Sequence, residues 1–179
     1  MTALVLTFAG RDRPGLVSLI AETIASAGGN WLESRLANLA GEFAGIVLID
    51  VATPQRHGLT TALQELQAQG LTVSVTPAGA QTPADYTPLT LEVLGHDRPG
   101  IVRDVTQILT RLGVNIENFS SAIESAPFTG EDMFRATLDL GVPGHVSTAE
   151  LRRALEALAD EIMVDVQLPA LEEEEATTL

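Results

Sequence analysis

The chain has 179 residues, of which 45% are hydrophobic and 19% are charged, a composition typical of a folded protein with one domain or two small ones. It contains no cysteine, which excludes disulfides, thiolate zinc sites and a cysteine nucleophile. All ten basic residues are arginines and the formal net charge is −14, which argues against direct nucleic-acid binding, because such binding depends on cations that neutralise phosphates.

Apolar spacing in the first half of the chain predicts the order strand, helix, strand, strand, helix, strand. Residues that alternate along 4–8 indicate the first strand, and residues three or four apart from 16 to 27 indicate the first helix. Gly28 and Gly29 lie where the C-cap of this helix is expected. Two strands follow over about 30–39 and 43–53. A second helix and a closing strand take their apolar positions from Leu59, Leu63 and Leu66 and from Leu71, Val73 and Val75.

The second half predicts the same six elements in the same order. An alternating strand over 89–93 precedes a helix over about 101–112, with Gly113 as its C-cap residue. Two strands, over about 115–124 and 133–140, lead to a helix that begins after Ser147, the N-cap of a capping-box pattern. The last helix and the closing strand take their apolar positions from Leu151, Leu155 and Leu158 and from Ile162, Val164 and Val166.

A nine-residue segment appears twice, which indicates that the two halves arose by duplication. Residues 9–17 (AGRDRPGLV) recur 85 positions later as residues 94–102 (LGHDRPGIV). The same offset pairs Asn30 with Asn115. Two copies of the order βαββαβ predict an α+β protein made of two tandem ferredoxin-like domains with antiparallel sheets.

The predicted domains occupy residues 1–78 and 87–168. Residues 79–86 contain Gly, Ala, Pro and Thr without a periodic pattern and are predicted to form a linker. Residues 169–179 contain four consecutive glutamates, so we expect an acidic disordered tail whose like charges stay solvated. Interaction of this tail with a partner is the alternative.

The turn between the first strand and the first helix has the composition of a ligand-binding loop. Pro14 suits the first helical turn, because its missing N–H leaves nothing unsatisfied there, and Gly15 lets a ligand approach the backbone. The N–H groups of Gly15, Leu16 and Val17 offer an anion site at the positive end of the helix dipole. Asp12 could accept hydrogen bonds from an ammonium group. An α-amino acid carries both an anionic and an ammonium group.

The second copy repeats this arrangement with Asp97, Pro99, Gly100, Ile101 and Val102. In the alternative interpretation, Asp12 and Asp97 only cap the helices and the Pro-Gly pairs only shape the turns. The recurrence of the arrangement in two equivalent loops keeps both interpretations open.

The pattern Gly-x-Asp-Arg-Pro-Gly-[Leu/Ile]-Val, placed after a strand and at the start of a helix, resembles that of ACT domains. Two such domains, which together span about residues 2–168, are similar to the layout of the glycine cleavage system transcriptional repressor family. The resemblance implies binding of a small amino acid, and repression through a protein partner rather than through direct DNA contact. It also implies ligand sites at domain interfaces near the first loop, at Asp12, Pro14, Gly15, Leu16, Asn30, Asp97, Pro99, Gly100, Ile101 and Asn115.

Two asparagines in this set come from the start of the second strand of each copy. Asn30 and Asn115 are expected near the same loop in such folds, where an amide could contact the ligand. Their alternative role is to satisfy the backbone of a turn.

No other pattern in the sequence predicts catalysis or a cofactor. His57, His96 and His145 lie in different loops, without the spacing that would form a metal site. The sequence has neither a nucleophile elbow nor a Gly-rich dinucleotide loop. We therefore expect a regulatory protein that is not an enzyme and that needs no metal or cofactor. The alternative to a transcriptional regulator is a regulatory subunit that binds and tunes an amino-acid metabolic enzyme.

The chain is predicted to be cytoplasmic and to have no contact with membranes. No apolar run approaches the roughly 20 residues of a membrane-spanning helix, and the first eight residues lack the basic start of a secretory signal. A ferredoxin-like half leaves one sheet face without helices, and Phe43, Val47 and Ile49 predict that this face or an edge strand is buried against another copy. Packing of the two halves together and a homodimer of two chains both stay open.

Overall fold

The computed structural model describes residues 1–79, 85–125, 131–156 and 162–167. These divide into two compact units, one from Met1 to Gln81 and one from Thr82 to Leu179, and each unit is described by itself. The predicted acidic tail and most of the predicted linker lie outside the described residues. The domain limits of 1–78 and 87–168 remain a proposal.

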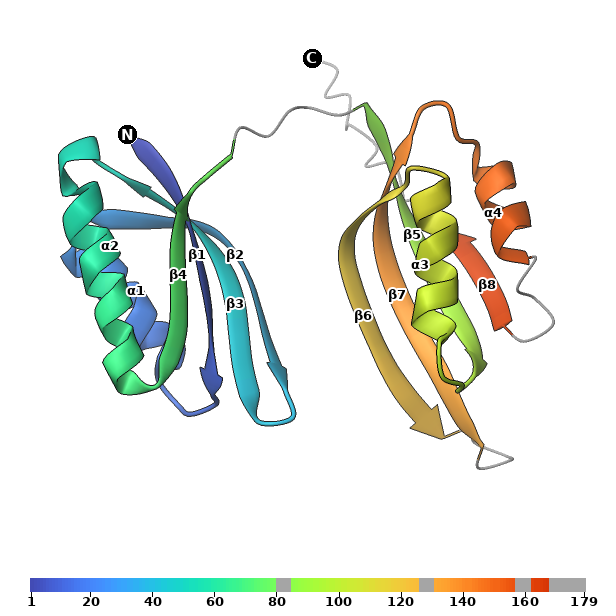
Figure 1. Ribbon diagram of the computed structural model, residues 1–179, viewed down its shortest axis with the longest axis horizontal. Helices are drawn as coiled ribbons and strands as arrows, with labels where there is room; N and C mark the ends of the chain where they lie inside the picture. Colours follow the sequence, from blue (N-terminus) through green and yellow to red (C-terminus); the bar gives the residue numbers. More distant parts are fainter. Residues whose placement is uncertain (80–84, 126–130, 157–161, 168–179) are drawn as a thin grey trace, which may run out of the picture. The chain divides into compact units, whose positions relative to one another are not determined.

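The first unit is a four-stranded antiparallel sheet with both of its α-helices on one face (Figure 1). Its strand order is β2-β3-β1-β4, so β1 and β3 are central and β2 and β4 are the edges. Its elements are β1 (Thr2–Arg11), α1 (Leu16–Ser26), β2 (Gly29–Leu39), β3 (Glu42–Val51), η1 (Thr53–Gln55), α2 (Arg56–Glu65), η2 (Leu66–Gln69) and β4 (Leu71–Pro77).

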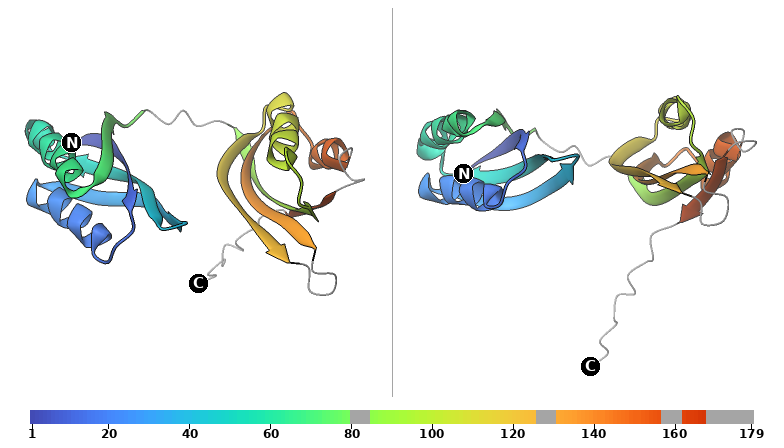
Figure 2. Two further views of the ribbon diagram at one scale, coloured as in Figure 1. Left: turned by 60° about the horizontal axis from the view of Figure 1, so that its bottom comes forward. Right: turned by 90° about the horizontal axis from the view of Figure 1, so that it is seen from below.

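The second unit has the same topology, with strand order β6-β7-β5-β8. Its elements are β5 (Tyr86–His96), α3 (Ile101–Arg111), β6 (Asn115–Ser125), β7 (Asp132–Pro143), α4 (Thr148–Glu156) and β8 (Ile162–Gln167). Two further views show helices on one face of the sheet in each unit (Figure 2). The predicted α+β fold of two tandem ferredoxin-like domains is confirmed.

Each core forms where the apolar stripe of two helices meets one face of the sheet. In the first unit, Leu4, Leu6 and Phe8 of β1 are buried, together with Leu16, Ile20 and Ile24 of α1. The spacing of three or four residues along α1 and of two along β1 turns these side chains toward one another.

The prediction that Phe43, Val47 and Ile49 lie on the sheet face without helices was wrong. Val47 and Ile49 are completely buried beneath the helices, and Phe43 packs against the same core. The residues of β3 that face away from the helices are Ile46 and Leu48 instead. Since β3 is apolar at nearly every position, its alternation does not tell which set faces the helices.

The helix ends follow the sequence signals with small differences. Helix α4 begins as predicted, because the N–H of Glu150 donates to the hydroxyl of Ser147 at 3.2 Å. Helix α2 ends at Glu65, and Leu66, predicted to be part of it, begins the tighter turn η2 instead. Leu158, predicted in the last helix, lies outside the described residues.

Candidate functional site

The loop between β1 and α1 leaves the start of α1 open. Gly15 is the N-cap residue with φ of 91°, a left-handed conformation that favours glycine, and α1 begins at Leu16. Pro14, predicted in the first helical turn, therefore lies just before the N-cap. A Cβ atom added to Gly15 would meet no atom within 4 Å. The backbone of this turn can thus be approached by a ligand.

The first turn of α1 has no capping partner from the side chains that the structure describes. No side-chain cap hydrogen bond is present at this end, and the first turn contains no acidic residue. Leu16 is buried and anchors the turn in the core, whereas Val17 is 42% exposed beside the loop. Because the first N–H groups of a helix have no partner within the helix, they can bind an anion here.

Asp12 is held beside this turn by the hairpin between β2 and β3. Its N–H donates to the carbonyl of Gly41 at 2.9 Å, and its carboxylate accepts a hydrogen bond from the amide of Asn38. A carboxylate has about four acceptor positions, so that of Asp12 can accept further hydrogen bonds. Asn38 was not predicted as a site residue, and only the pairing of β2 with β3 brings it near the loop.

Arg13 fixes the other side of the loop. Its guanidinium donates to the carbonyl of Gln69 at 3.1 Å, in the corner between η2 and β4. Gly10 lies against the same corner, since a Cβ there would come within 2.8 Å of the carbonyl oxygen of Gly70. The loop is therefore tied to two different turns of the sheet.

The second loop has the same backbone but is covered by side chains of its own. Gly100 is the N-cap of α3 with φ of 92°. The guanidinium of Arg103 lies 3.1 Å from the position of a Cβ added to Gly100. Asp97 donates its N–H to the carbonyl of Asp132, and Pro99 and Val102 are exposed, whereas Ile101 is buried. Ile101 donates its N–H to the carbonyl of Arg98 at 3.4 Å.

Three charged side chains pair with one another at the start of α3. Asp104 is in the first turn and forms ion pairs with Arg98 at 2.8 Å and with Arg103 at 2.9 Å. Hydrogen bonds from Arg103 and then from Arg98 hold the pKa of Asp104 below its ordinary value. The matching residue in α1, 85 positions earlier, is Leu19. The two loops thus share a fold and differ in charge.

Asn30 and Asn115 are not near these loops within their own units. Asn30 is paired with Asp50, which is paired with Ala3 at the start of β1, whereas Asp12 follows the end of β1. Asn115 is paired with Gly141, at the corresponding end of the second sheet. The 11 residues of α1 carry the chain about 16 Å across the sheet before β2 begins. Their predicted position near the loop is therefore wrong for a single domain.

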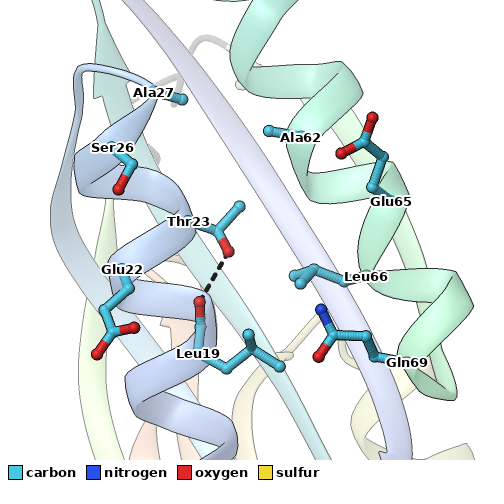
Figure 3. A pocket seen from close by; sticks show the side chains of 9 residues that line it. All are labelled: Leu19, Glu22, Thr23, Ser26, Ala27, Ala62, Glu65, Leu66 and Gln69. Carbon is cyan, nitrogen blue, oxygen red and sulfur yellow. Dashed lines mark hydrogen bonds between the residues drawn. The ribbon is translucent and has the colours of Figure 1, made fainter.

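A groove of about 400 Å³ lies between α1 and α2 of the first unit (Figure 3). Leu19 and Leu66 contribute apolar surface to it, and Glu22 and Glu65 come from opposite helices. The groove adjoins the first loop, because Leu19 donates its N–H to the carbonyl of Gly15. Sequence reasoning missed the groove. The small residues Thr23, Ser26, Ala27 and Ala62 on facing helices were its signal.

Other kinds of site receive no support from the described ranges. Within them, no group of three or more His, Asp and Glu side chains could hold a metal ion. None of the described helices is long and apolar enough to cross a membrane.

Comparisons with known proteins agree with this architecture. Models of the ACT domain match residues 2–76 and 89–160. The glycine cleavage system transcriptional repressor of Escherichia coli is 26% identical over 164 residues, covering 89% of this chain and 85% of the relative.

Two crystal structures are similar over nearly the whole chain. One is an unknown protein from Galdieria sulphuraria, with a TM-score of 0.77, 30% identity and coverage of 93% of this chain and 97% of the other. The other, a protein assigned as a glycine cleavage system transcriptional repressor, has a TM-score of 0.69, 20% identity and coverage of 93% and 96%. With two matching domain models and a shared fold, the chain belongs to the ACT domain family and carries two ACT domains in tandem.

Proposed function

We propose that this protein is a regulator without catalytic activity that binds a small α-amino acid at the β1–α1 loop. The observation that carries the proposal is the open first turn of α1 beside Asp12. It offers N–H donors for a carboxylate and an acceptor for an ammonium group a short distance away. ACT domains are regulatory modules, and the similarity to a repressor supports the same role here.

The proposed ligand lies with its carboxylate on the N–H groups of Gly15, Leu16 and Val17. The end of the helix contributes about half a unit of positive charge, worth roughly 0.3–1 kcal/mol to an anion. The ammonium group binds the carboxylate of Asp12, which Asn38 already orients. These few contacts predict modest affinity, with selectivity supplied by whatever surface contacts the side chain of the ligand.

The first loop is the stronger of the two candidate sites. In the second loop, Gly100–Val102 and Asp97 offer the same groups, but the Arg103 side chain, which is ion-paired with Asp104, lies over Gly100. A ligand would have to move the Arg103 guanidinium away from Asp104 to reach the N–H groups of this turn. We therefore expect one ligand per chain at low ligand concentration, bound at the first loop.

Signal output is proposed to pass through a protein partner. The net charge of −14 predicts weak binding to DNA, whereas the relative is a transcriptional repressor. A partner that contacts DNA would reconcile the two, and glycine metabolism is the expected target. Affinity capture from a lysate, with and without added glycine or serine, tests this step. Recovery of a DNA-binding protein supports it, and recovery of a biosynthetic enzyme favours the regulatory-subunit alternative.

Calorimetry with the common amino acids tests the ligand itself. Asp12→Asn should weaken binding, because the ammonium group loses its charged acceptor, while Asp97→Asn serves as the matched control in the second loop. Equal weakening by both substitutions would contradict the assignment to the first loop. An absence of binding by every amino acid would leave both loops as ordinary helix starts.

A further inference from the structure

The sheet face that carries no helix is apolar in the first unit. Cross-strand neighbours share a face, so the pairing of Val5 with Leu48 and of Thr7 with Ile46 places these residues together. Ile46 is 53% exposed, and Val5 and Leu48 are partly exposed. We call Val5, Ile46 and Leu48 the apolar strip. Small or uncharged residues on the same face are Ala3, Thr7, Ala9, Ala37 and Ala44, and its charged neighbours are Glu33, Arg35 and Asp50.

The same face of the second unit is polar. At the positions matching the apolar strip it has Thr90, Thr137 and Asp139. These polar groups bond to their neighbours: Asp139 accepts hydrogen bonds from Thr90 and from Asn118, each at 3.2 Å. Arg135 and Glu124 form an ion pair at 3.0 Å on the same face. The fold therefore does not require apolar residues at these positions, and their presence in the first unit indicates a covered surface.

The charges beside the apolar strip nearly cancel, because Glu33, Glu42 and Asp50 share the face with Arg11 and Arg35 and leave a net charge of −1. Arg35 and Glu33, the cross-strand neighbours of Ile46 and Leu48, form an ion pair at 2.9 Å. Arg11 and Glu42 form a second pair at 3.4 Å on this face. This face therefore carries both positive and negative side chains. The net charge of the whole chain is −14, of which residues 1–79 contribute only −2.

From this balance we infer that the apolar strip is the contact surface for a second copy of the chain. A two-fold interface places the same patch on both sides, so the patch must complement itself. An apolar centre beside nearly balanced charges meets this condition, whereas a surface rich in one sign would repel its copy. Two chains of net charge −14 repel one another over most of their surfaces, and this face lets them approach with little repulsion. Sheets packed face to face in this way interleave their side chains.

Sedimentation velocity of the full chain over a dilution series is the primary test. The wild-type protein should form a concentration-dependent dimer. Ile46→Glu should raise the dimer dissociation constant by about 100-fold or more, because each dimer would bury two added carboxylates whose neighbour Arg35 already pairs with Glu33. Thr137→Glu, at the matching position of the second unit, is the control and should leave the dimer intact.

A second variant distinguishes loss of the interface from misfolding caused by Ile46→Glu. The triple substitution Val5→Thr, Ile46→Thr and Leu48→Asp transfers residues that the second unit already accommodates at these positions, so the fold should tolerate it. Circular dichroism should stay unchanged while the dimer is lost.

Labelling supplies an independent readout, because the chain has no cysteine of its own. Ile46→Cys should react with a maleimide more slowly as protein concentration rises, and Thr137→Cys should react at a constant rate. A monomeric wild-type chain at all concentrations would overturn the inference. So would a dimer that survives the triple substitution, or protection of Ile46→Cys that does not depend on concentration.

Discussion

Alanine at the two N-cap glycines should separate folding from ligand binding. Gly15 and Gly100 have φ of 91° and 92°, so Gly15→Ala and Gly100→Ala impose the same left-handed strain. That strain is about 1–2 kcal/mol for a residue with a Cβ atom. The new Cβ meets nothing at Gly15, and at Gly100 it meets only the Arg103 guanidinium, whose side chain is 68% exposed and can move aside. Both variants should therefore lose similar stability.

Ligand binding should respond differently in the two variants. The methyl group at Gly15 fills the space through which the ligand approaches the first N–H groups of α1, so affinity should fall at least about tenfold, which corresponds to roughly 1.4 kcal/mol. Gly100→Ala should leave the affinity unchanged, because the second loop is closed by its own side chains.

Thermal unfolding and calorimetry on the same preparations give both quantities. For a unit of this size, each kcal/mol lowers Tm by roughly 4–8 °C, so both variants should shift measurably. Equal loss of affinity in both variants, or loss only with Gly100→Ala, would refute the assignment of the ligand to the first loop. A much larger Tm loss for Gly100→Ala would refute the stability argument.

Four further predictions follow from the second unit and from the overall charge. Arg103→Ala should uncover Gly100 and open the second loop to a ligand carboxylate, so calorimetric stoichiometry should rise from one toward two; unchanged stoichiometry would show that this side chain does not close the loop. Because the pKa of Asp104 is lowered from 3.8, its ionised form stabilises the folded unit above that pH, and the stabilisation is lost as the pH falls through the lower folded-state value. The Tm gap between wild type and Asp104→Asn should therefore narrow from about pH 7 to about pH 3. Ser147→Ala should cost about 1 kcal/mol in urea unfolding through loss of the α4 cap, whereas Ser147→Thr retains the hydroxyl and should cost less. The purified chain should give no salt-sensitive gel shift with duplex DNA at micromolar protein, and such a shift would show that the negative charge does not prevent contact.

The order of elements was predictable because burial repeats with different periods in strands and helices. Leu4, Leu6 and Phe8, and Leu16, Ile20 and Ile24, are buried at the spacings that predicted β1 and α1. The orientation of β3 was not predictable, because Val47 and Ile49 and the opposite set, Ile46 and Leu48, are all apolar. Choosing between the sets requires knowledge of where the helices lie.

The candidate loops were predictable as segments, but their surroundings were not. Repetition of Asp-Arg-Pro-Gly located both helix starts, and φ above 90° at Gly15 and Gly100 agrees with the need for glycine. The misplaced asparagines show what repetition cannot supply: it equates Asn30 with Asn115 between copies and says nothing of distances within a copy. The hydrogen bond from Asn38 to Asp12 joins residues 26 positions apart. It forms only because the β2–β3 hairpin lies beside the end of β1.

Differences between the two copies place both proposed binding surfaces in the first unit. There the helix start is open and the sheet face without helices is apolar. In the second unit the Arg103 side chain covers the helix start, and Asp139 forms hydrogen bonds on the sheet face. Residues 80–179 also carry a net charge of −12, against −2 for residues 1–79. Strong charge keeps a surface solvated and separate from its copies. The proposed association through the nearly neutral first unit therefore brings together the parts of two chains that repel each other least.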